Sequence, residues 1–319
     1  MKKVLIWVAL GLMGLGVALF VGLGFMVDFD FLRLDTMKYL TNTYDITDIF
    51  HSIDVDTITA DVEFRLAEDG KCRVVCYEQE EVLHDVHVKD GTLVIDAKDT
   101  RSWLDHLSFF NFKTPSITVY LPEQEYQALE VNNTTGDLKL SGPWCLDKLS
   151  LKVTTGDIRA DGMTCKKDID IHVTTGSMIL KNLNCEKLNV SGSTGQTTMK
   201  NVRVSEKAQL RWTTGGLLME DCGVGNLSLD GTTGDAMLKN VVVSDNLRAE
   251  TTTGDLKLEH CDAGELFLKA TTGDISASLL TQKIVFAHAS TGDVDVPSFT
   301  TGGRCEVTTT TGDICIRIP

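Results

Sequence analysis

The stretch LKVTTGDIRA, residues 151–160, contains a motif that returns along most of the chain, as VTTGSMIL at 173–180 and TTTGDICIRIP at 309–319. Each turn glycine follows the previous one by 19 or 20 residues. There are ten of them: Gly136, Gly156, Gly176, Gly195, Gly215, Gly234, Gly254, Gly273, Gly292 and Gly312. A period in this range is typical of repeat proteins, in which each unit buries its apolar face against its neighbours.

Inside one repeat, apolar and polar residues alternate. Leu138 and Leu140 flank Lys139, the run 149–153 alternates in the same way, and a shorter apolar pair lies between them. Period two indicates strands with one buried face. Corners that recur in one register favour stacked coils over the competing up-and-down barrel. We therefore predict an all-β fold, a parallel, right-handed β-solenoid of about ten coils, roughly 45 Å long.

The N-terminus carries an uncharged run from Val4 to Val27, preceded by Lys2 and Lys3. As a helix this run would measure about 36 Å, enough to cross a hydrocarbon core of about 30 Å. Because no convincing small-x-small site follows, we favour an uncleaved transmembrane anchor over a cleaved signal peptide. The basic residues keep the N-terminus in the cytoplasm. We expect a single-pass cell-membrane protein with its C-terminal domain outside the cytoplasm, and a small-residue stripe in the anchor suited to self-association.

Four regions follow from these patterns: a cytoplasmic tip and anchor (1–27), a juxtamembrane linker (28–44), β-rich first coils with a cap (45–130) and the repeat solenoid (131–319). The helically spaced stretch RSWLDHLSFFNF, residues 101–112, is expected to cover the first coil, because an open solenoid end is an unpaired strand edge. No comparable segment follows the last repeat. We therefore expect the C-terminal coil to be a contact surface, suited to self-association.

Four motifs in order carry a family resemblance: IDVDTITADVEF (53–64), GTLVID (91–96), ITVYLP (117–122) and the TTGD ladder. Together they resemble the bacterial putative-adhesin domains of unknown function. The resemblance covers roughly residues 45–319. It implies an exported or anchored β-solenoid of the cell envelope with adhesin-like contacts, and some relatives are linked to envelope stress. It supplies no catalytic residues.

The composition narrows the function. A net charge of −15 argues against a nucleic-acid partner, which needs a basic face. We predict a non-catalytic, membrane-anchored binding or assembly surface whose partner is an envelope protein or polysaccharide. The alternative is a carbohydrate-active solenoid enzyme that acts on cell-surface polysaccharide. It is disfavoured because the repeats carry no loop insertions that would build a groove, and the histidines form no nucleophile or metal signature.

The aspartate after the corner glycine suggests one candidate metal site. In early rungs a cation follows two residues later, as in Lys139, Arg159 and Lys257, whereas the last rungs lack one. We therefore considered a Ca²⁺ site, since Ca²⁺ takes several oxygen ligands, at Asp274, Asp293, Asp295 and Asp313. The competing interpretation is that corner aspartates accept backbone N–H or threonine hydroxyl bonds. No other cofactor is predicted.

A candidate contact surface lies where the acidic row is interrupted by Ser177, Gln196 and Gly216. On consecutive rungs there, the outward position three residues after the corner glycine carries an uncharged residue. Because exposed apolar patches often mark binding sites, we consider this row a candidate contact surface. The residues are Ile179, Thr198, Leu218 and Met237.

The nine cysteines are an odd number, so at least one is unpaired within a monomer. Most are expected inside the solenoid as small hydrophobic residues, with Cys315 as a free outward thiol. The expected inward set is Cys145, Cys165, Cys185, Cys222 and Cys261.

Overall fold

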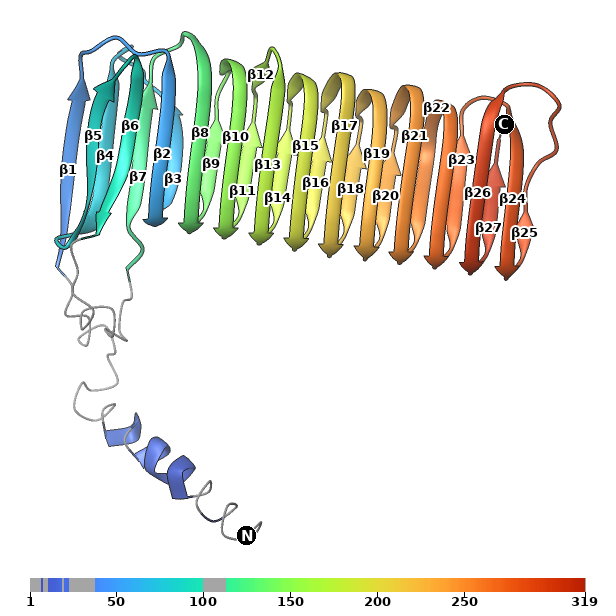
Figure 1. Ribbon diagram of the computed structural model, residues 1–319, viewed down its shortest axis with the longest axis horizontal. Helices are drawn as coiled ribbons and strands as arrows, with labels where there is room; N and C mark the ends of the chain where they lie inside the picture. Colours follow the sequence, from blue (N-terminus) through green and yellow to red (C-terminus); the bar gives the residue numbers. More distant parts are fainter. Residues whose placement is uncertain (1–6, 8–10, 19, 23–37, 100–112, 319) are drawn as a thin grey trace.

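The computed structural model describes residues 7, 11–18, 20–22, 38–99 and 113–318 (Figure 1). Residues 7, 11–18 and 20–22 are helical, and every other regular element in this described part of the chain is a strand. Within the described residues, no helix is both long and apolar enough to cross a membrane. Much of the predicted anchor (4–27) and the whole predicted cover (101–112) lie outside the described residues.

The predicted β-solenoid is confirmed, with about ten turns. Its wider side, called here the long-strand face, is a parallel sheet in which each strand from β2 to β21 pairs with the corresponding strand of the next coil. In chain order its strands are β2 (Ser52–Thr59), β8 (Glu125–Thr135), β10 (Cys145–Thr155), β13 (Asp168–Thr175), β15 (Asn184–Thr194), β17 (Arg203–Thr214), β19 (Gly223–Thr233), β21 (Val242–Thr253), β22 (Leu256–Thr272), β24 (Lys283–Thr291) and β26 (Gly303–Thr311).

The opposite side, the short-strand face, is also parallel, and its four-residue strands pair in register. The first half of the long β22 belongs to this face. The other strands of this face are β3 (Asp61–Leu66), β9 (Leu138–Ser141), β11 (Ile158–Asp161), β14 (Met178–Lys181), β16 (Thr197–Lys200), β18 (Leu217–Glu220), β20 (Ala236–Lys239), β23 (Ile275–Leu279), β25 (Val294–Asp295) and β27 (Ile314–Arg317). A short extra strand, β12 (Thr164–Cys165), pairs instead with β10 and β15 of the long-strand face.

The first coil is covered by strands that run antiparallel to one another. They are β1 (Tyr39–Ile46), β4 (Cys72–Gln79), β5 (Val82–Lys89), β6 (Thr92–Asp99) and β7 (Ser116–Leu121). β6 and β7 extend the two faces, pairing with β2 and β3, while β5 and β4 add further antiparallel strands and β1 pairs with β4. This cap protects the strand edges of the first coil.

The last two coils stack out of chain order, which the sequence analysis did not predict. β26 lies between β22 and β24, and β27 lies between β23 and β25 (Figure 1). The exposed end is therefore the coil 283–295, and the expectation that the C-terminal coil ends the stack is wrong. At paired positions the inserted coil carries the larger apolar side chains: Val307 lies opposite Ala287 of the end coil, and Ile314 lies opposite Val294. Burying the more apolar coil removes more apolar surface from water.

The core runs the length of the stack, filled by the alternating inward residues. Cys165, Cys185, Cys222 and Cys261 are buried free thiols, as predicted, and Cys315 is a partly exposed free thiol. The prediction for Cys145 is wrong: its thiol is partly exposed. In that coil the strand is shifted by one residue, so that Trp144 and Leu146 fill the interior instead.

Candidate functional site

Each TTGD corner is a tight turn that stacks directly on the corner of the next coil. Gly156 has φ of 144°, and a Cβ there would lie 2.1 Å from the Gly136 carbonyl oxygen. Real side chains do not fit at such a distance, so only glycine is possible. The Gly136 N–H donates to Thr155 O at 2.9 Å, which ties adjacent corners together.

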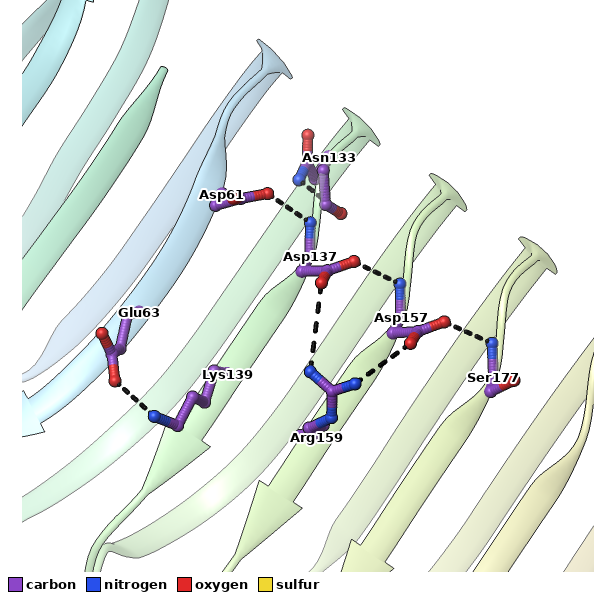
Figure 2. A network of polar contacts seen from close by, with 9 residues as sticks. Asp61, Glu63, Asn133, Asp137, Lys139, Asp157, Arg159 and Ser177 are labelled. Carbon is purple, nitrogen blue, oxygen red and sulfur yellow. Dashed lines mark hydrogen bonds and ion pairs between the residues drawn. The ribbon is translucent and has the colours of Figure 1, made fainter. Parts of the chain in front are cut away.

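The corner aspartates form a hydrogen-bonded ladder along the stack (Figure 2). The Asp137 N–H donates to Asp61 Oδ1 at 2.8 Å, the Asp157 N–H to Asp137 Oδ1 at 2.9 Å, and the Ser177 N–H to Asp157 Oδ1 at 2.8 Å. Each carboxylate therefore accepts a backbone N–H that the corner would otherwise leave exposed, as the hydrogen-bond interpretation requires. The ladder stops at Ser177 and resumes at Asp235.

The cations near this ladder do not all pair with the corner aspartate two residues before them. Arg159 contacts both Asp157, at 3.2 Å, and Asp137, at 3.9 Å (Figure 2). Lys139 instead pairs with Glu63 at 2.8 Å (Figure 2). The pKa of the Glu63 carboxyl is lowered, mainly by a hydrogen bond from Arg65 and also by the one from Lys139. Lys257 pairs with Glu259 at 2.8 Å. A cation two residues after a corner aspartate therefore does not by itself identify its partner.

Three of the candidate calcium ligands belong to the same ladder. The Asp313 N–H donates to Asp274 Oδ1, and the Asp293 N–H donates to Asp313 Oδ1, both at 2.8 Å. Asp295 pairs with Arg317 at 2.6 Å, so the expectation that it lacks a cation is wrong. The hydrogen bond from Arg317 lowers the pKa of Asp295. This geometry favours the hydrogen-bonding role, and the calcium site stays a prediction.

A buried polar cluster that the sequence analysis missed joins the cap to the first coil. Among the described residues, one set of three potential metal ligands has its ligand atoms within 4.8 Å of one another: Cys76, Glu78 and His84. His84 Nδ1 lies 2.7 Å from Glu78 Oε2, His84 Nε2 lies 2.9 Å from Thr57 Oγ1, and Asn42 donates to Glu78 Oε1 at 2.6 Å.

The order hydroxyl, imidazole, carboxylate matches that of nucleophilic triads, but Thr57 is only 1% exposed, so no substrate reaches it. Burial raises the pKa of the Cys76 thiol to about 12, with Glu78 adding to the effect. Because these side chains come from β1, β2, β4 and β5, the cluster fastens the cap. In the sequence, the cluster could have been recognised only from polar residues that occupy inward positions of predicted strands.

The predicted contact row is contiguous on the short-strand face. Ile179, Thr198, Leu218 and Met237 are paired in register from β14 to β20, and all four are partly buried. They form a neutral stripe between Arg159 and Lys257. Its role as a contact surface stays a prediction.

The long-strand face contains a groove that the sequence analysis did not predict. One hollow of about 460 Å³ crosses β13 to β22, and a second of about 290 Å³ crosses β10 to β17; both are lined by His172, Ser191 and Arg211. We call their joint lining the long-strand groove. It runs across the strands and therefore along the stack of coils.

Two glycines mark the floor of the groove. At the inward position three residues before each corner glycine, successive coils carry Val153, Val173, Gly192, Trp212 and Gly231. The Trp212 indole occupies the space beside Gly231, where a Cβ would lie 2.3 Å from the ring. Only glycine backbone therefore stands on either side of Trp212, in a row that earlier coils fill with valine.

The walls of the groove are polar and electrically balanced. Hydroxyl and amide side chains dominate: Ser150, Asn189, Ser191, Ser193, Gln209, Thr213, Thr232, Thr252 and Thr271. Three fixed cations face three carboxylates, namely Lys152, Arg211 and Lys269 against Asp170, Asp230 and Glu250. Cross-strand bonds hold some of them, such as His172 Nδ1 to Ser191 Oγ at 2.7 Å and Asn189 to Asp170 at 2.8 Å.

Two side chains that line the larger hollow keep a polar atom without a hydrogen-bond partner. Trp212 is 5% exposed and Thr251 4%, yet Trp212 Nε1 and Thr251 Oγ1 have no partner. A buried polar group without a partner costs about 1–3 kcal/mol, and such groups are rare in folded proteins.

Comparisons with known proteins agree with this architecture. Residues 50–298 match the family described as Toastrack DUF4097. A "putative adhesin" from Parabacteroides distasonis has 15% identity and a TM-score of 0.51, over 88% of this chain and 98% of that one. A "putative adhesin" from Bacteroides fragilis has 15% identity and a TM-score of 0.42, over 88% and 97%.

A "putative lipid binding protein" from Parabacteroides distasonis has 14% identity and a TM-score of 0.45, over 86% of this chain and 96% of that one. A comparison with curated proteins gives no match. At such identities the likeness to the solved structure with a TM-score of 0.51 supports the fold alone. The family match, however, spans most of the cap and the solenoid, and the chain belongs to the Toastrack DUF4097 family.

Proposed function

We propose that the chain is a non-catalytic, membrane-anchored protein of the cell envelope, whose solenoid binds an envelope component through its long-strand face. The observation that carries this proposal is the long-strand groove, a hollow over several coils that is lined by hydroxyl, amide and charged side chains. A rigid, fully paired sheet suits binding, because its side chains are held in place before the ligand arrives. The adhesin names given to solved proteins of similar fold are in line with this role.

Anchoring in the membrane is the part of the proposal that rests on residues 4–27. Deleting them should move the protein from the membrane fraction to a soluble one. In cells whose cytoplasmic membrane is intact and accessible from outside, added protease should digest the solenoid and leave the N-terminal tip undigested. Protection of the solenoid in such cells would contradict the proposed orientation.

The alternative of a carbohydrate-active enzyme has one observation in its favour. Asp230 and Glu250 lie opposite each other on β19 and β21, inside the groove. Neighbouring strands are about 4.8 Å apart, close to the separation of about 5 Å between the carboxyls of retaining glycosidases. However, Arg211 lies 3.8 Å from Asp230, and Arg248 pairs with Glu250. Each of the two carboxylates therefore already has a cation beside it.

One experiment separates the two functions. The purified full chain, in a detergent without a sugar headgroup, is incubated with peptidoglycan, extracted surface polysaccharide and envelope proteins of the bacterium that encodes it. We expect co-sedimentation or pull-down with at least one fraction and no release of reducing ends. Release of reducing ends that Glu250→Gln abolishes would establish the enzyme, and failure to bind every fraction would refute the proposed function.

A self-contact surface and a link to envelope stress complete the proposal. The end coil carries Phe286 and Val294, which are 55% and 44% exposed, beside the edge of β24 that pairs with no other described strand. Together with the stripe at Leu218, it is the place where a second copy would bind. Phe286→Lys or Leu218→Glu should reduce the cross-linking of two copies of the protein in cells. The link to envelope stress is tested separately: agents that damage the envelope should raise the amount of the protein.

A further inference from the structure

The long-strand groove also limits what kind of ligand it can take. Every strand that forms it is paired on both sides, from β10 to β22. Peptides that bind by adding a strand need an unpaired edge, because main-chain hydrogen bonds provide their affinity. The backbone of this face is already used in the sheet, so a ligand must be recognised by side chains.

Those side chains point to a ligand rich in hydroxyl groups. Serine and threonine hydroxyls and the amides of Asn189 and Gln209 both donate and accept hydrogen bonds. Hydroxyl groups of a sugar do the same, whereas lipid tails need an apolar lining. The equal numbers of lining cations and carboxylates favour a ligand without net charge, because a charged one would meet repulsion from half of them.

The direction of the groove indicates a polymer. It crosses successive strands, which repeat at about 4.8 Å, and equivalent positions of the repeat therefore offer similar contacts on one coil after another. The row Ser193, Thr213, Thr232, Thr252 and Thr271 shows this repetition on one wall of the larger hollow. A linear chain with a short repeat can use such a row, while a compact small molecule would touch only part of it.

The two floor glycines make this stretch different from the coils before it. The row of inward side chains is interrupted on both sides of Trp212, and the tryptophan becomes part of the lining of the larger hollow. We propose that the long-strand groove binds a neutral linear polysaccharide that lies along the solenoid axis, with its centre over Trp212. This inference rests on the proposed function and specifies its ligand and its site.

The test uses electrophoresis of the full chain, in a polyoxyethylene detergent, through gels that contain a neutral glucan, mannan or galactan, or an anionic polyuronate. We expect at least one neutral polymer to retard the protein, and moderate salt to change the retardation little, because few charges take part. Retardation by the polyuronate alone, or by none of the neutral polymers, would overturn the proposal.

A matched pair of variants then locates the site. Thr232 and Thr154 are exposed and occupy the same position of the repeat, but only Thr232 lines the groove. Thr232→Trp should fill the larger hollow and weaken binding about tenfold or more, the effect of losing about 1.4 kcal/mol. Thr154→Trp should bind like the unaltered protein. Equal binding by both variants would place the site elsewhere.

The outcomes also separate this inference from the proposed function. If the protein binds an envelope fraction but no neutral polysaccharide, the function stands and the ligand class is wrong. If it binds a neutral polysaccharide and Thr232→Trp has no effect, the ligand class stands and the groove is wrong. If it binds no envelope material and no polysaccharide, both fail.

Discussion

Each coil turns at two corners, and the two differ in what they demand of the sequence. At the TTGD corner, φ of the glycine lies between 120° and 147°, and a Cβ would run into the carbonyl of the adjacent coil. At the second corner, six residues after most corner glycines, φ lies near 50° in the coils that carry Asn182, Asn201, Asp221, Asn240 or His260. That is the ordinary left-handed region, which asparagine and aspartate enter readily.

The comparison explains why one corner is conspicuous in the sequence and the other is not. The first corner excludes every side chain, so glycine returns at every coil. The second accepts several polar residues, and it is stabilised by bonds between them: Asn201 donates to Asn182 at 2.8 Å, and Asn240 to Asp221 at 3.0 Å. A side-chain ladder at this corner corresponds to the aspartate ladder at the first.

The largest effect is expected at the TTGD corner. Gly156→Ala places a Cβ against backbone that cannot move aside and imposes an unfavourable φ. We expect a loss of about 3 kcal/mol or more in the free energy of unfolding, measured by urea denaturation with circular dichroism. A loss as small as that of a second-corner variant would remove the distinction between the corners.

A smaller effect is expected at the second corner. Asn201→Ala keeps the left-handed turn without the side chain that tolerates it and removes the bond to Asn182, at a cost of about 1–2 kcal/mol. Asn201→Gly is the control, because glycine recovers the backbone freedom while the bond is still lost. If both variants unfold at the same urea concentration, backbone conformation does not matter at this corner.

The aspartate ladder should contribute less to the free energy of unfolding than the corner glycine that precedes each aspartate. Asp255 accepts the Asp274 N–H at 2.8 Å, and Lys257 pairs with Glu259 instead of with it. Asp255→Ala should cost about 1 kcal/mol in unfolding free energy, and Asp255→Asn, which keeps an acceptor oxygen, should cost less. Faster amide hydrogen exchange at residue 274 in the alanine variant is the local readout, and unchanged exchange would argue against the ladder.

The smallest effect concerns a carboxylate on a flat strand, where no corner N–H is available. Burial raises the pKa of Asp54, and the neighbouring charges of Glu130, Asp96 and Asp56 raise it further. A raised pKa in the folded state means that the folded protein binds the proton more tightly, so stability falls as pH rises through that pKa. Asp54→Asn should therefore be slightly more stable than the unaltered protein at about pH 7 and lose that advantage at about pH 4.

The repeat made most of the fold predictable, because a strict spacing of glycines and alternating residues can arise from few structures. The groove could not be predicted in the same way. It depends on where Trp212 lies relative to Gly192 and Gly231, and adjacent positions in the stack are 19 or 20 residues apart in the chain. Similarly, Glu78 and His84 are only polar strand residues in the sequence, because their contact depends on how the cap strands pack over the first coil.

The order of the last coils has a consequence for how the protein is made. Coils up to β23 can add one after another as the chain emerges, each on a completed neighbour. The coil 283–295 cannot follow, because its place is defined by pairing with β26 and β27, which are synthesised later. It must wait, or bind transiently to β22 and be displaced. By either route, folding finishes at the distal end, and a chain truncated after residue 295 would build a stack one coil shorter, with a different surface at its tip.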